Sequence, residues 1–288
     1  MAPSEVQTPN VILYNNGLMI TISIVTYKTD INELKRCFES LNSSSVKRVY
    51  VVDNSQQQYI MDFCKAFPNV EYIPSKNIGY GASHNKAIRK SMLDGTNYHL
   101  VLNSDVYFSP DVLERLENYM NTHKDVAMVQ PNIIYPDGRM QYSCRLLPTP
   151  ANLIFRRFLP SKMIKDMNYR YLLMMFDHKR ELNVPYHQGS FMFFRVKCLE
   201  DVGLFDERFF MYPEDIDMSR RMHRYYRTMF WPEATVVHAH KAASYKSKKM
   251  LAIHIWNMIK YFTKWGWLID PERKEWNREV IREINNKY

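Results

Sequence analysis

The sequence is poor in cysteine, and the few cysteines it has follow no pattern. Cys37, Cys64, Cys144 and Cys198 are spread over 288 residues, and no two of them form a CxxC pair. Zinc knuckles and disulfide frameworks need cysteines at characteristic spacings. We therefore expect neither, and the four thiols are predicted to be reduced and buried.

Long apolar runs and targeting signals are also missing. A membrane-spanning helix needs roughly 18 or more consecutive apolar residues, and no such run occurs. The opening segment MAPSEVQTPN lacks the basic start and apolar stretch of a secretory signal. These absences predict a cytoplasmic protein without a membrane-spanning segment, in which residues 1–20 form a polar leader.

The common nucleotide-binding fingerprints fail as well. The segment KNIGYGASHN, residues 76–85, places two glycines before a predicted helix but matches neither GxGxxG nor GxxxxGKS/T. Gly79 and Gly81 still allow a tight turn, while Asn77 and Asn85 can hydrogen-bond a sugar or a neighbouring loop. Because the chain contains no repeat and no low-complexity linker, one two-part domain is expected.

What the sequence does contain is enough apolar material for a core and an excess of positive charge. Hydrophobic residues make up 46% and aromatic residues 14% of the chain, which excludes a disordered protein. The formal net charge of +9 predicts a surface that attracts anions. Nucleic acid, phosphorylated small molecules and acidic lipid head groups all fit that charge.

Strand and helix patterns alternate along the first half of the chain. This alternation predicts an α/β fold with a parallel or mixed sheet flanked by helices. Functional groups are then expected at the carboxyl ends of the strands. The predicted strands are 21–26, 49–52, 70–73, 99–102, 126–129, 190–194 and 235–238, and the predicted helices are 32–41, 59–67, 81–93 and one that begins at Pro110.

Polar side chains follow two of these strands. Asp53 comes directly after VYVV, and Asn103, Ser104 and Asp105 come after HLVL. An aspartate at a strand end can accept hydrogen bonds from a nucleobase or a ribose, and one on a loop can hold a divalent cation against a diphosphate. Aspartate is also a common turn residue, so each position alone is a weak signal.

A metal ion would need a further protein ligand, because one loop carboxylate binds Mg²⁺ or Mn²⁺ poorly. His238, at the end of the strand-like TVV, is the first candidate and His240 the second. A lone histidine is more often a structural hydrogen-bonding residue, so both interpretations stay open.

The segment FDERFFMYPEDIDMSRR, residues 205–221, concentrates acid at a predicted helix start and base along the helix. Glu214, Asp215 and Asp217 follow Pro213 closely. Helical spacing would place Arg220, Arg224 and Arg227 on one face. The pattern fits a helix cap with a solvated basic face, and it equally fits a catalytic acid cluster.

The C-terminal segment is basic and aromatic. Residues 241–288 contain 11 Lys and Arg against 5 Asp and Glu, a net charge of +6. A predicted helix carries the apolar stripe Leu251, Ile255, Met258, Phe262 and Trp265, with Asn257, Lys260 and Lys264 opposite. It is expected either to lie on a membrane surface or to pack on its own domain.

Taken in order, these segments resemble an inverting glycosyltransferase of family 2 with the GT-A fold. The similarity runs from about Ile22 to about Trp267, and it is greatest to the rhamnosyltransferase-like branch, which shares the segment Asp137–Pro150. The resemblance implies a GT-A domain over 21–245, with a nucleotide-binding half 21–105 and an acceptor half 106–245, followed by a helical segment 246–288. The segments that carry it are ISIVTYK, VVDNS, NIGYGASHN, LNSDV, GSFMFFR, FDERFFMYPEDIDMSRR and VVHAHKAAS.

The resemblance also implies roles for individual residues. Asp215 would be the catalytic base, and Asp105 and His238 would hold a divalent metal, Mg²⁺ or Mn²⁺. Asn103 stands where the family has an aspartate, so the metal site departs from the usual pattern. The residues implied to bind the nucleotide are Thr26, Tyr27, Asp53, Asn77, Gly79, Asn103 and Ser104, and those implied to shape the donor and acceptor pocket are Gly189, Ser190, Glu214 and Asp217.

The implied reaction moves one deoxyhexose from a dTDP or UDP sugar, with rhamnose from dTDP-rhamnose as first choice, to a polyprenyl-diphosphate-linked or growing cell-surface glycan. A processive synthase is not expected, since QxxRW is missing after the acidic segment. The basic C-terminal segment would lie on the inner face of the plasma membrane. The alternatives are a sugar nucleotidyltransferase, whose glycine-rich loop is missing at TYKTD, a catalytically degenerate scaffold, and a nucleic-acid-binding protein, although no nucleic acid partner is expected.

Overall fold

The computed structural model describes residues 19–153, 159–160, 162–239 and 248–286. Almost all of the expected leader 1–20 and the alternative ligand His240 lie outside these residues. The strands are β1 (Ile20–Thr26), β2 (Val46–Asp53), β3 (Val70–Pro74), β4 (Tyr98–Asn103), β5 (Val106–Tyr107), β6 (Val126–Ile134), β7 (Cys144–Arg145), β8 (Leu182–Asn183), β9 (Tyr186–His187), β10 (Phe191–Arg195) and β11 (Arg227–His238). The helices are α1 (Ile31–Glu39), α2 (Gln58–Cys64), α3 (Tyr80–Leu93), α4 (Asp111–Thr122), α6 (Lys165–Tyr171), α7 (Val196–Val202), α8 (Pro213–His223), α9 (Lys248–Trp265) and α10 (Pro271–Asn285).

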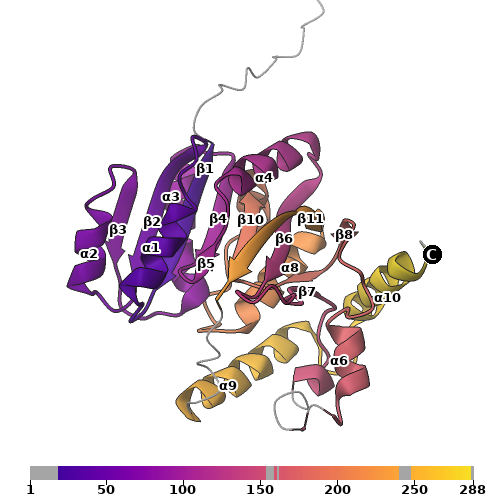
Figure 1. Ribbon diagram of the computed structural model, residues 1–288. Coiled ribbons are helices and arrows are strands. Elements are labelled where there is room, and N and C mark those ends of the chain that lie inside the picture. Colours follow the sequence, from indigo (N-terminus) through magenta and orange to yellow (C-terminus); the bar gives the residue numbers. More distant parts are fainter. Residues whose placement is uncertain (1–18, 154–158, 161, 240–247, 287–288) are drawn as a thin grey trace, which may run out of the picture.

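One mixed sheet forms the centre of the molecule, with strand order β3-β2-β1-β4-β10-β6-β11-β5 (Figure 1). The first four strands run parallel to one another, and β6 runs parallel to β11. Strand β10 lies antiparallel between β4 and β6 and joins the two parallel groups. The expected α/β class with a mixed, mostly parallel sheet is thereby confirmed.

Helices cover both faces of this sheet, because successive side chains of a strand point to opposite faces. On β4, Leu100 and Leu102 pack with α1, α2 and α4, whereas Val101 packs with α3, α7 and α8. The strands are therefore buried on both sides, which explains why TISIVT, VYVV and HLVL read as continuous apolar runs.

A second hydrophobic cluster joins the C-terminal helices to the rest of the molecule. Tyr261 and Phe262 of α9 and Val280 and Ile284 of α10 pack with the region around β7, α6 and α8. In Figure 1, α9 crosses below the sheet while α6 and α10 lie at the lower right. Among the described residues, no helix combines the length and the apolar character that crossing a bilayer requires.

Two details of the C-terminal half differ from the sequence interpretation. Helix α8 ends at His223, and Arg227 begins strand β11, so Arg220, Arg224 and Arg227 do not share a helical face. Arg220 is buried and not solvated. The apolar run after Arg227 explains the change, because it pairs with β6 in the sheet.

Helix α9 is also oriented differently from the simple apolar stripe. Asn257, assigned to the polar side, is buried and donates from Nδ2 to the Met211 carbonyl oxygen at 2.9 Å. Ile255, assigned to the apolar side, is exposed. The protein surface that α9 covers contains carbonyl and carboxylate oxygens, so polar side chains of the helix are needed on its buried side.

Candidate active site

The carboxyl ends of three parallel strands bring the first group of site residues together. In the sheet register, Thr26 of β1 lies opposite Asp53 of β2, and Val25 lies opposite Asn103 of β4. Thr26 is fully buried, and among the described residues its Oγ1 has no hydrogen-bond partner. The next residue, Tyr27, has 52% of its surface exposed. A buried hydroxyl that needs a partner and an exposed ring beside it are both suited to a nucleoside.

Asp53 is fully buried and organises the loop after β2. Its Oδ1 accepts from the Ser55 backbone N–H and hydroxyl, both at 2.9 Å, and its Oδ2 accepts from the Gln57 N–H at 2.6 Å and the Tyr72 hydroxyl at 3.1 Å. These contacts satisfy most of the capacity of the carboxylate. Asp53 therefore fixes the wall of the site at the end of β2.

The glycine turn before α3 is held against the segment that precedes α8. Gly79 has φ +103, and a side chain there would place Cβ 2.4 Å from the Phe210 carbonyl oxygen. The Tyr80 N–H donates to the same oxygen at 2.9 Å. Asn77 is exposed, and its Oδ1 lies 3.4 Å from the Gly79 nitrogen. The glycine is needed for close backbone approach, while no phosphate-binding fingerprint is present.

Asp105 and His238 face each other across the short pairing of β5 with β11. The Asp105 Oδ1 lies 3.4 Å from the His238 Nε2. Gln141 donates from Nε2 to the His238 carbonyl oxygen at 2.8 Å, so its Oε1 is left to accept from the His238 Nδ1 at 2.9 Å. Nδ1 is thereby engaged with Gln141, and the other ring nitrogen, Nε2, is the one that faces Asp105.

Two electron-pair donors that face each other are suited to share a cation. Histidine metal ligands usually donate their other ring N–H to a fixed oxygen, as His238 does to Gln141. In the described part of the chain, no group of three or more His, Cys, Asp and Glu residues could form a complete metal site. Mg²⁺ and Mn²⁺ at a diphosphate need only one or two protein ligands, so the pair of Asp105 and His238 fits such an ion.

Asp215 lies at the N-terminal turn of α8, where two backbone N–H groups hold its carboxylate. Gly189 donates to Oδ2 at 3.0 Å and Ile216 donates to Oδ1 at 2.8 Å. Burial raises the pKa of Asp215 to about 6, while these N–H groups and the positive charge of Arg145 act in the opposite direction. A carboxylate with this pKa can take a proton near neutral pH.

Three further polar atoms near Asp215 are buried without a hydrogen-bond partner among the described residues. They are the Glu214 Oε2, the Ser190 Oγ and the Tyr212 Oη. Burial and the neighbouring Asp215 raise the pKa of Glu214 well above its usual value, which favours its neutral form. Buried polar atoms of this kind are suited to contact a polar ligand such as a sugar.

The backbone in front of α8 is strained. Tyr212 has φ 97 and ψ −73, a conformation that costs a non-glycine residue about 1–3 kcal/mol. Its ring packs edge-on against His254 of α9 at 4.6 Å between centroids. Strain of this kind, directly before the helix that carries Asp215, is typical of functional sites.

Tyr80 connects the strand-end residues to the Asp215 group. Its hydroxyl lies 2.8 Å from the Asn103 Oδ1 and 2.7 Å from the Gly189 carbonyl oxygen. Burial, followed by the charges of Glu214, Asp215 and Asp105, raises the pKa of Tyr80 well above its usual value. The structure thus brings Asn103, Asp105 and Asp215 around one buried phenol, with Ser104 at the same turn.

Asp217 faces α9 instead of this group. Its fully buried carboxylate accepts from the Lys264 Nζ at 2.5 Å, the Trp265 Nε1 at 2.8 Å and the Arg221 Nε at 2.8 Å. With both oxygens engaged, Asp217 stabilises the packing of α8 on α9. Closeness in the sequence grouped it with Glu214 and Asp215. Neighbouring residues of a helix point in different directions, however, so Asp217 faces α9.

Three residues that build the site were missed in the sequence. They are Tyr80, which bonds the Gly189 carbonyl oxygen, Gln141, which bonds His238, and Arg145, whose charge acts on the pKa of Asp215. Tyr80 lies between the two glycines of NIGYG, and a signal for it was available in that pattern. Gln141 and Arg145 belong to DGRMQYSCR, where nothing local shows that they turn toward residues about 70 to 100 positions later.

Comparison with known proteins identifies relatives among the glycosyltransferases. Residues 21–203 match the profile of "Glycosyl transferase family 2". The chain is 30% identical over 210 residues to a low-salt glycan biosynthesis hexosyltransferase, Agl10, of Haloferax volcanii, covering 71% of this chain and 62% of that protein. It is 27% identical over 247 residues to an N-acetylglucosaminyl-diphospho-decaprenol L-rhamnosyltransferase of Mycobacterium tuberculosis, covering 78% and 77%.

Among solved structures, GalNAc-T7 with UDP, GalNAc and Mn²⁺ superposes with a TM-score of 0.60 at 13% sequence identity. The match covers 78% of this chain and 43% of that one. The chain therefore spans less than two thirds of the length of Agl10 and of GalNAc-T7. The likeness to GalNAc-T7 confirms the expected GT-A type of fold.

Proposed function

Because this chain belongs to glycosyl transferase family 2, we propose that it transfers one sugar from a nucleotide diphosphate sugar to a hydroxyl of a lipid-linked or growing glycan, with inversion at the anomeric carbon. The observation that supports this most directly is the position of Asp215. Two backbone N–H groups, those of Gly189 and Ile216, hold its carboxylate. The carbonyl oxygen of the same Gly189 accepts from the Tyr80 hydroxyl, so Gly189 connects Asp215 to Tyr80.

In the proposed reaction, Asp215 removes the proton of the acceptor hydroxyl as that oxygen attacks the anomeric carbon. The bond between this carbon and the diphosphate oxygen breaks, and the electron pair leaves with the nucleoside diphosphate. Attack from the opposite side inverts the configuration. A carboxylate placed for such a proton transfer contributes a factor of about 10² to 10⁴ in rate.

Asp105 and His238 are proposed to hold Mg²⁺ or Mn²⁺ against the diphosphate. When bound, such an ion offsets the negative charge that develops on the leaving group. The Gln141 side chain keeps His238 in the tautomer that this requires. Asn103 is neutral and bonded to Tyr80, so we assign it to positioning and not to metal binding.

The donor and acceptor are proposed from the relatives. Rhamnose from dTDP-rhamnose is the first candidate donor and UDP sugars are the second, because one relative is named as an L-rhamnosyltransferase and one neighbour was solved with UDP. The same relative is named for an acceptor on diphospho-decaprenol, which supports a polyprenyl-diphosphate acceptor here. Thr26, Tyr27 and Asp53 are proposed to line the base and ribose site, with Asn77, Gly79 and Ser104 close to it.

The test is a donor screen with purified protein. Release of nucleoside diphosphate is measured over dTDP-rhamnose, UDP-galactose, UDP-glucose and UDP-N-acetylglucosamine, with Mn²⁺ or EDTA. We expect turnover of one donor, its loss in EDTA and its recovery with Mn²⁺ or Mg²⁺. Turnover of none of these donors would count against the transferase, and equal turnover in EDTA would remove the metal from the proposal.

We also propose that α9 contacts an anionic membrane from the inner face. Trp256 is 60% exposed, Ile255 and Ile259 are exposed on either side of it, and the C-terminal segment is basic. Flotation with phosphatidylglycerol liposomes tests this in the variant Trp256→Glu. Reduced flotation is expected, with Trp231→Phe, a partly buried ring far from α9, as control, and equal flotation of both variants would contradict membrane contact.

A further inference from the structure

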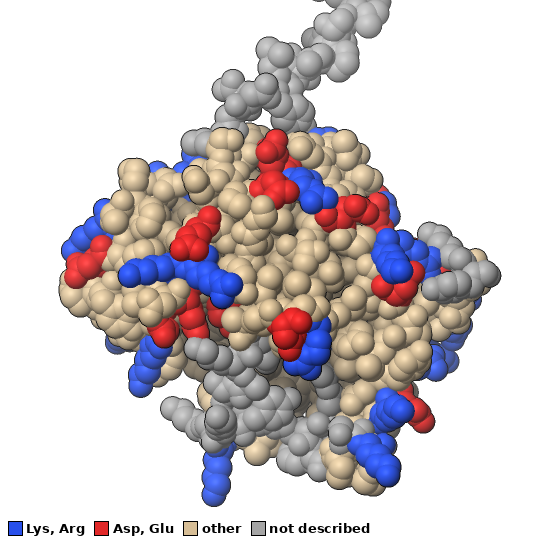
Figure 2. Space-filling view, viewed as in Figure 1, with Lys and Arg blue, Asp and Glu red and all other residues tan. Residues whose placement is uncertain are grey.

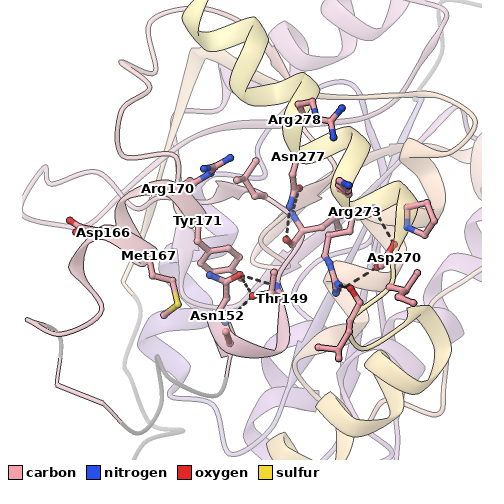
Figure 3. Close-up of a pocket in the computed structure, with 17 residues that line it drawn as sticks. Thr149, Asn152, Asp166, Met167, Arg170, Tyr171, Asp270, Arg273, Asn277 and Arg278 are labelled. Atoms are coloured by element: carbon pink, nitrogen blue, oxygen red, sulfur yellow. Dashed lines mark hydrogen bonds and ion pairs between the residues drawn. The ribbon is translucent and has the colours of Figure 1, made fainter.

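We propose that a cavity lined by Leu146 and Leu147, which directly follow Arg145, binds the diphosphate and the first isoprenoid units of a lipid-linked acceptor. The cavity has a volume of about 990 Å³ and lies between α6, the segment after β7 and α10 (Figure 3). The inference rests on the proposed function for the identity of its ligand. It assigns a place to the lipid carrier that neither the family comparison nor the sequence provides.

The walls of this cavity are largely apolar. Leu146, Leu147 and Tyr171 form one side, and Leu268 and Ile269 form the edge at 90% and 86% exposure. These two side chains sit on a tight turn, because Gly266 has φ +106 and a Cβ there would lie 2.3 Å from the Ile269 carbonyl oxygen. A fixed turn that holds two aliphatic side chains in water is suited to cover an apolar ligand.

The rim of the cavity is cationic. Arg170 of α6 and Lys274 and Arg278 of α10 are exposed, and no described carboxylate lies within ion-pairing distance of any of the three. Arg273, on the same helix, is buried and lies 3.7 Å from Asp270. Figure 3 shows Asp166 at the outer edge, away from Arg170 and Arg278. The rim therefore carries excess positive charge that an anion can neutralise.

This excess is visible on the molecular surface. Figure 2 shows Lys and Arg side chains on the lower right of this face, over α6 and α10, whereas its centre is mostly uncharged. In Figure 3, Arg170 comes from one side of the cavity and Arg278 from the other. A head group between them would meet positive charge from both helices.

The cavity and Asp215 share structural elements. Leu146 and Leu147 directly follow Arg145, whose positive charge acts on Asp215. The Arg145 Nη2 lies 3.3 Å from the Gln188 Oε1, one residue before the Gly189 N–H that holds Asp215. A ligand in the cavity is thus next to the chain segment that begins with Arg145, and Arg145 connects it to Gln188 and to the charge of Asp215. This connection suits an acceptor whose reactive hydroxyl must reach Asp215.

The chemistry of the lining selects one class of ligand. An apolar wall with a cationic rim fits an amphiphile with a flexible hydrocarbon chain and a concentrated negative charge. An isoprenoid diphosphate has both. A phospholipid within a bilayer offers a similar charge but lies in a flat surface, which a recessed site does not match.

The experiment uses the full chain with its donor site blocked by saturating UDP and Mn²⁺. Farnesyl diphosphate, a short isoprenoid diphosphate, is titrated by calorimetry into the wild type and into Arg170→Gln/Arg278→Gln. Lys65→Gln/Arg89→Gln, which removes two exposed charges elsewhere, is the matched control. We expect binding to the wild type and the control, and weakening of roughly tenfold or more in the cavity variant, since tenfold corresponds to the loss of one good contact.

Two further measurements distinguish an isoprenoid diphosphate from a free diphosphate and from the head groups of a lipid bilayer. Inorganic pyrophosphate should bind more weakly than farnesyl diphosphate, and flotation with phosphatidylglycerol vesicles should be unchanged in the cavity variant. Equal affinity of the variant and the wild type for farnesyl diphosphate would overturn the inference. So would equal affinity of pyrophosphate and farnesyl diphosphate, because the apolar wall would then have no part in binding.

Failure of this inference and failure of the proposed function give different results. If Asp215→Asn abolishes transfer while the cavity variant binds farnesyl diphosphate normally, the cavity assignment alone is wrong. If the wild type binds farnesyl diphosphate through Arg170 and Arg278 but turns over no nucleotide sugar, the cavity stands and the transferase proposal fails.

Discussion

At the scale of single residues, Asp215 is set between opposing influences. Burial favours its neutral form, whereas the N–H groups of Gly189 and Ile216 and the charge of Arg145 favour its carboxylate. The resulting pKa of about 6 leaves the group ionised at neutral pH and still able to accept a proton. Burial and the charge of Asp215 also raise the pKa of its neighbour Glu214, so the two carboxyl groups disfavour a second negative charge in the site.

Replacing this carboxylate should remove the base and leave the nucleotide site intact. Asp215→Asn is expected to lower the transfer rate by about 10² to 10⁴ without changing the affinity for UDP. Steady-state kinetics and calorimetry measure the two quantities. Asp111→Asn, an exposed carboxylate on α4, is the control, and a transfer rate in Asp215→Asn equal to that control would exclude the base role.

The raised pKa of Asp215 also predicts a pH profile. Below about pH 6 the group is protonated and cannot act as a base, so kcat/KM should fall by about tenfold per pH unit there and level off above it. The rate is measured from pH 5 to 8 with a constant metal concentration. A profile that is flat across pH 6 would contradict the assignment.

Gly79 offers a test of the contact between the turn before α3 and the segment before α8. Gly79→Ala should cost more stability than Gly95→Ala, because both residues have positive φ but an added Cβ at Gly79 meets Phe210, whereas nothing lies within 4 Å at Gly95. The positive φ alone costs about 1–2 kcal/mol. Urea unfolding of the two variants gives the difference in their free energies of unfolding. Equal values would show that Phe210 moves away from the added Cβ at no cost in stability.

At the scale of elements, α8 links the active site to the C-terminal helices. Its first turn carries Glu214 and Asp215, and its middle carries the buried Arg220. The Arg220 guanidinium binds Asp270 through two hydrogen bonds of 2.7 and 2.6 Å and lies 4.1 Å from the centre of the Trp265 ring. The position of Asp215 therefore depends on residues from the end of α9 and the start of α10.

Two arginines of this helix region should differ sharply in their contribution to stability. Arg220→Ala is expected to cost about 3–5 kcal/mol, since it removes two short hydrogen bonds to the buried Asp270 and leaves it with the longer 3.7 Å contact to Arg273. Arg224→Ala removes an exposed pair with Glu272 and should cost about 0–1 kcal/mol. Chemical unfolding of both variants checks this, and similar losses would mean that the buried pair adds no more than the exposed one.

The elements themselves were largely predictable from the sequence, and their partners were not. Apolar runs such as TISIVT and HLVL identify β1 and β4, because a strand buried on both faces has no polar alternation. The residues around Arg227 were assigned to a helix, since the distant strand β6 that pairs with them leaves no local signal. Asn257 of α9 was placed in solvent for the same reason, as its partner Met211 is 46 residues away.

At the scale of the whole molecule, burial lowers the pKa of several histidines, of which His84, His99 and His187 lie in the core and His223 is partly buried. Burial lowers the pKa of His187 and His223 to about 4 and that of His99 to about 3, and it lowers the pKa of His84 well below 6.5. In the unfolded chain these groups take protons near pH 6.5, so acid favours unfolding. Glu214 and Asp215 act in the opposite direction, because their raised pKa values favour the folded state in acid.

The four histidines outnumber these two carboxyl groups, so the free energy of unfolding should fall as pH drops from about 6.5 towards 5. Urea unfolding at pH 7, 6 and 5.5 measures the trend. His223→Gln, which removes one of the four groups and can keep the contact with Thr228, should flatten it. Unfolding free energies that stay constant from pH 7 to 5.5 would contradict this balance.

Part of the geometry of the candidate site was predictable from the sequence, whereas the roles of its residues stay a prediction. The strand-end residues Asp53, Asn103 and Asp105 were placed correctly at one edge, because the topology of a parallel sheet dictates it. The orientation of the Asp217 side chain could not be predicted from the sequence, since it depends on where Lys264 and Trp265 pack. The cavity beside α10 left no motif at all, since its lining comes from three separate stretches of chain.

The pairing of Arg220 with Asp270 also bears on how the protein is made. During synthesis α8 is made before Asp270, which lies 50 residues after Arg220 in the sequence. The ion pairs that hold the middle of α8 can therefore form only once residues 270–272 have been made. A chain that ends before Asp270 is expected to hold Asp215, the proposed base, less firmly in position.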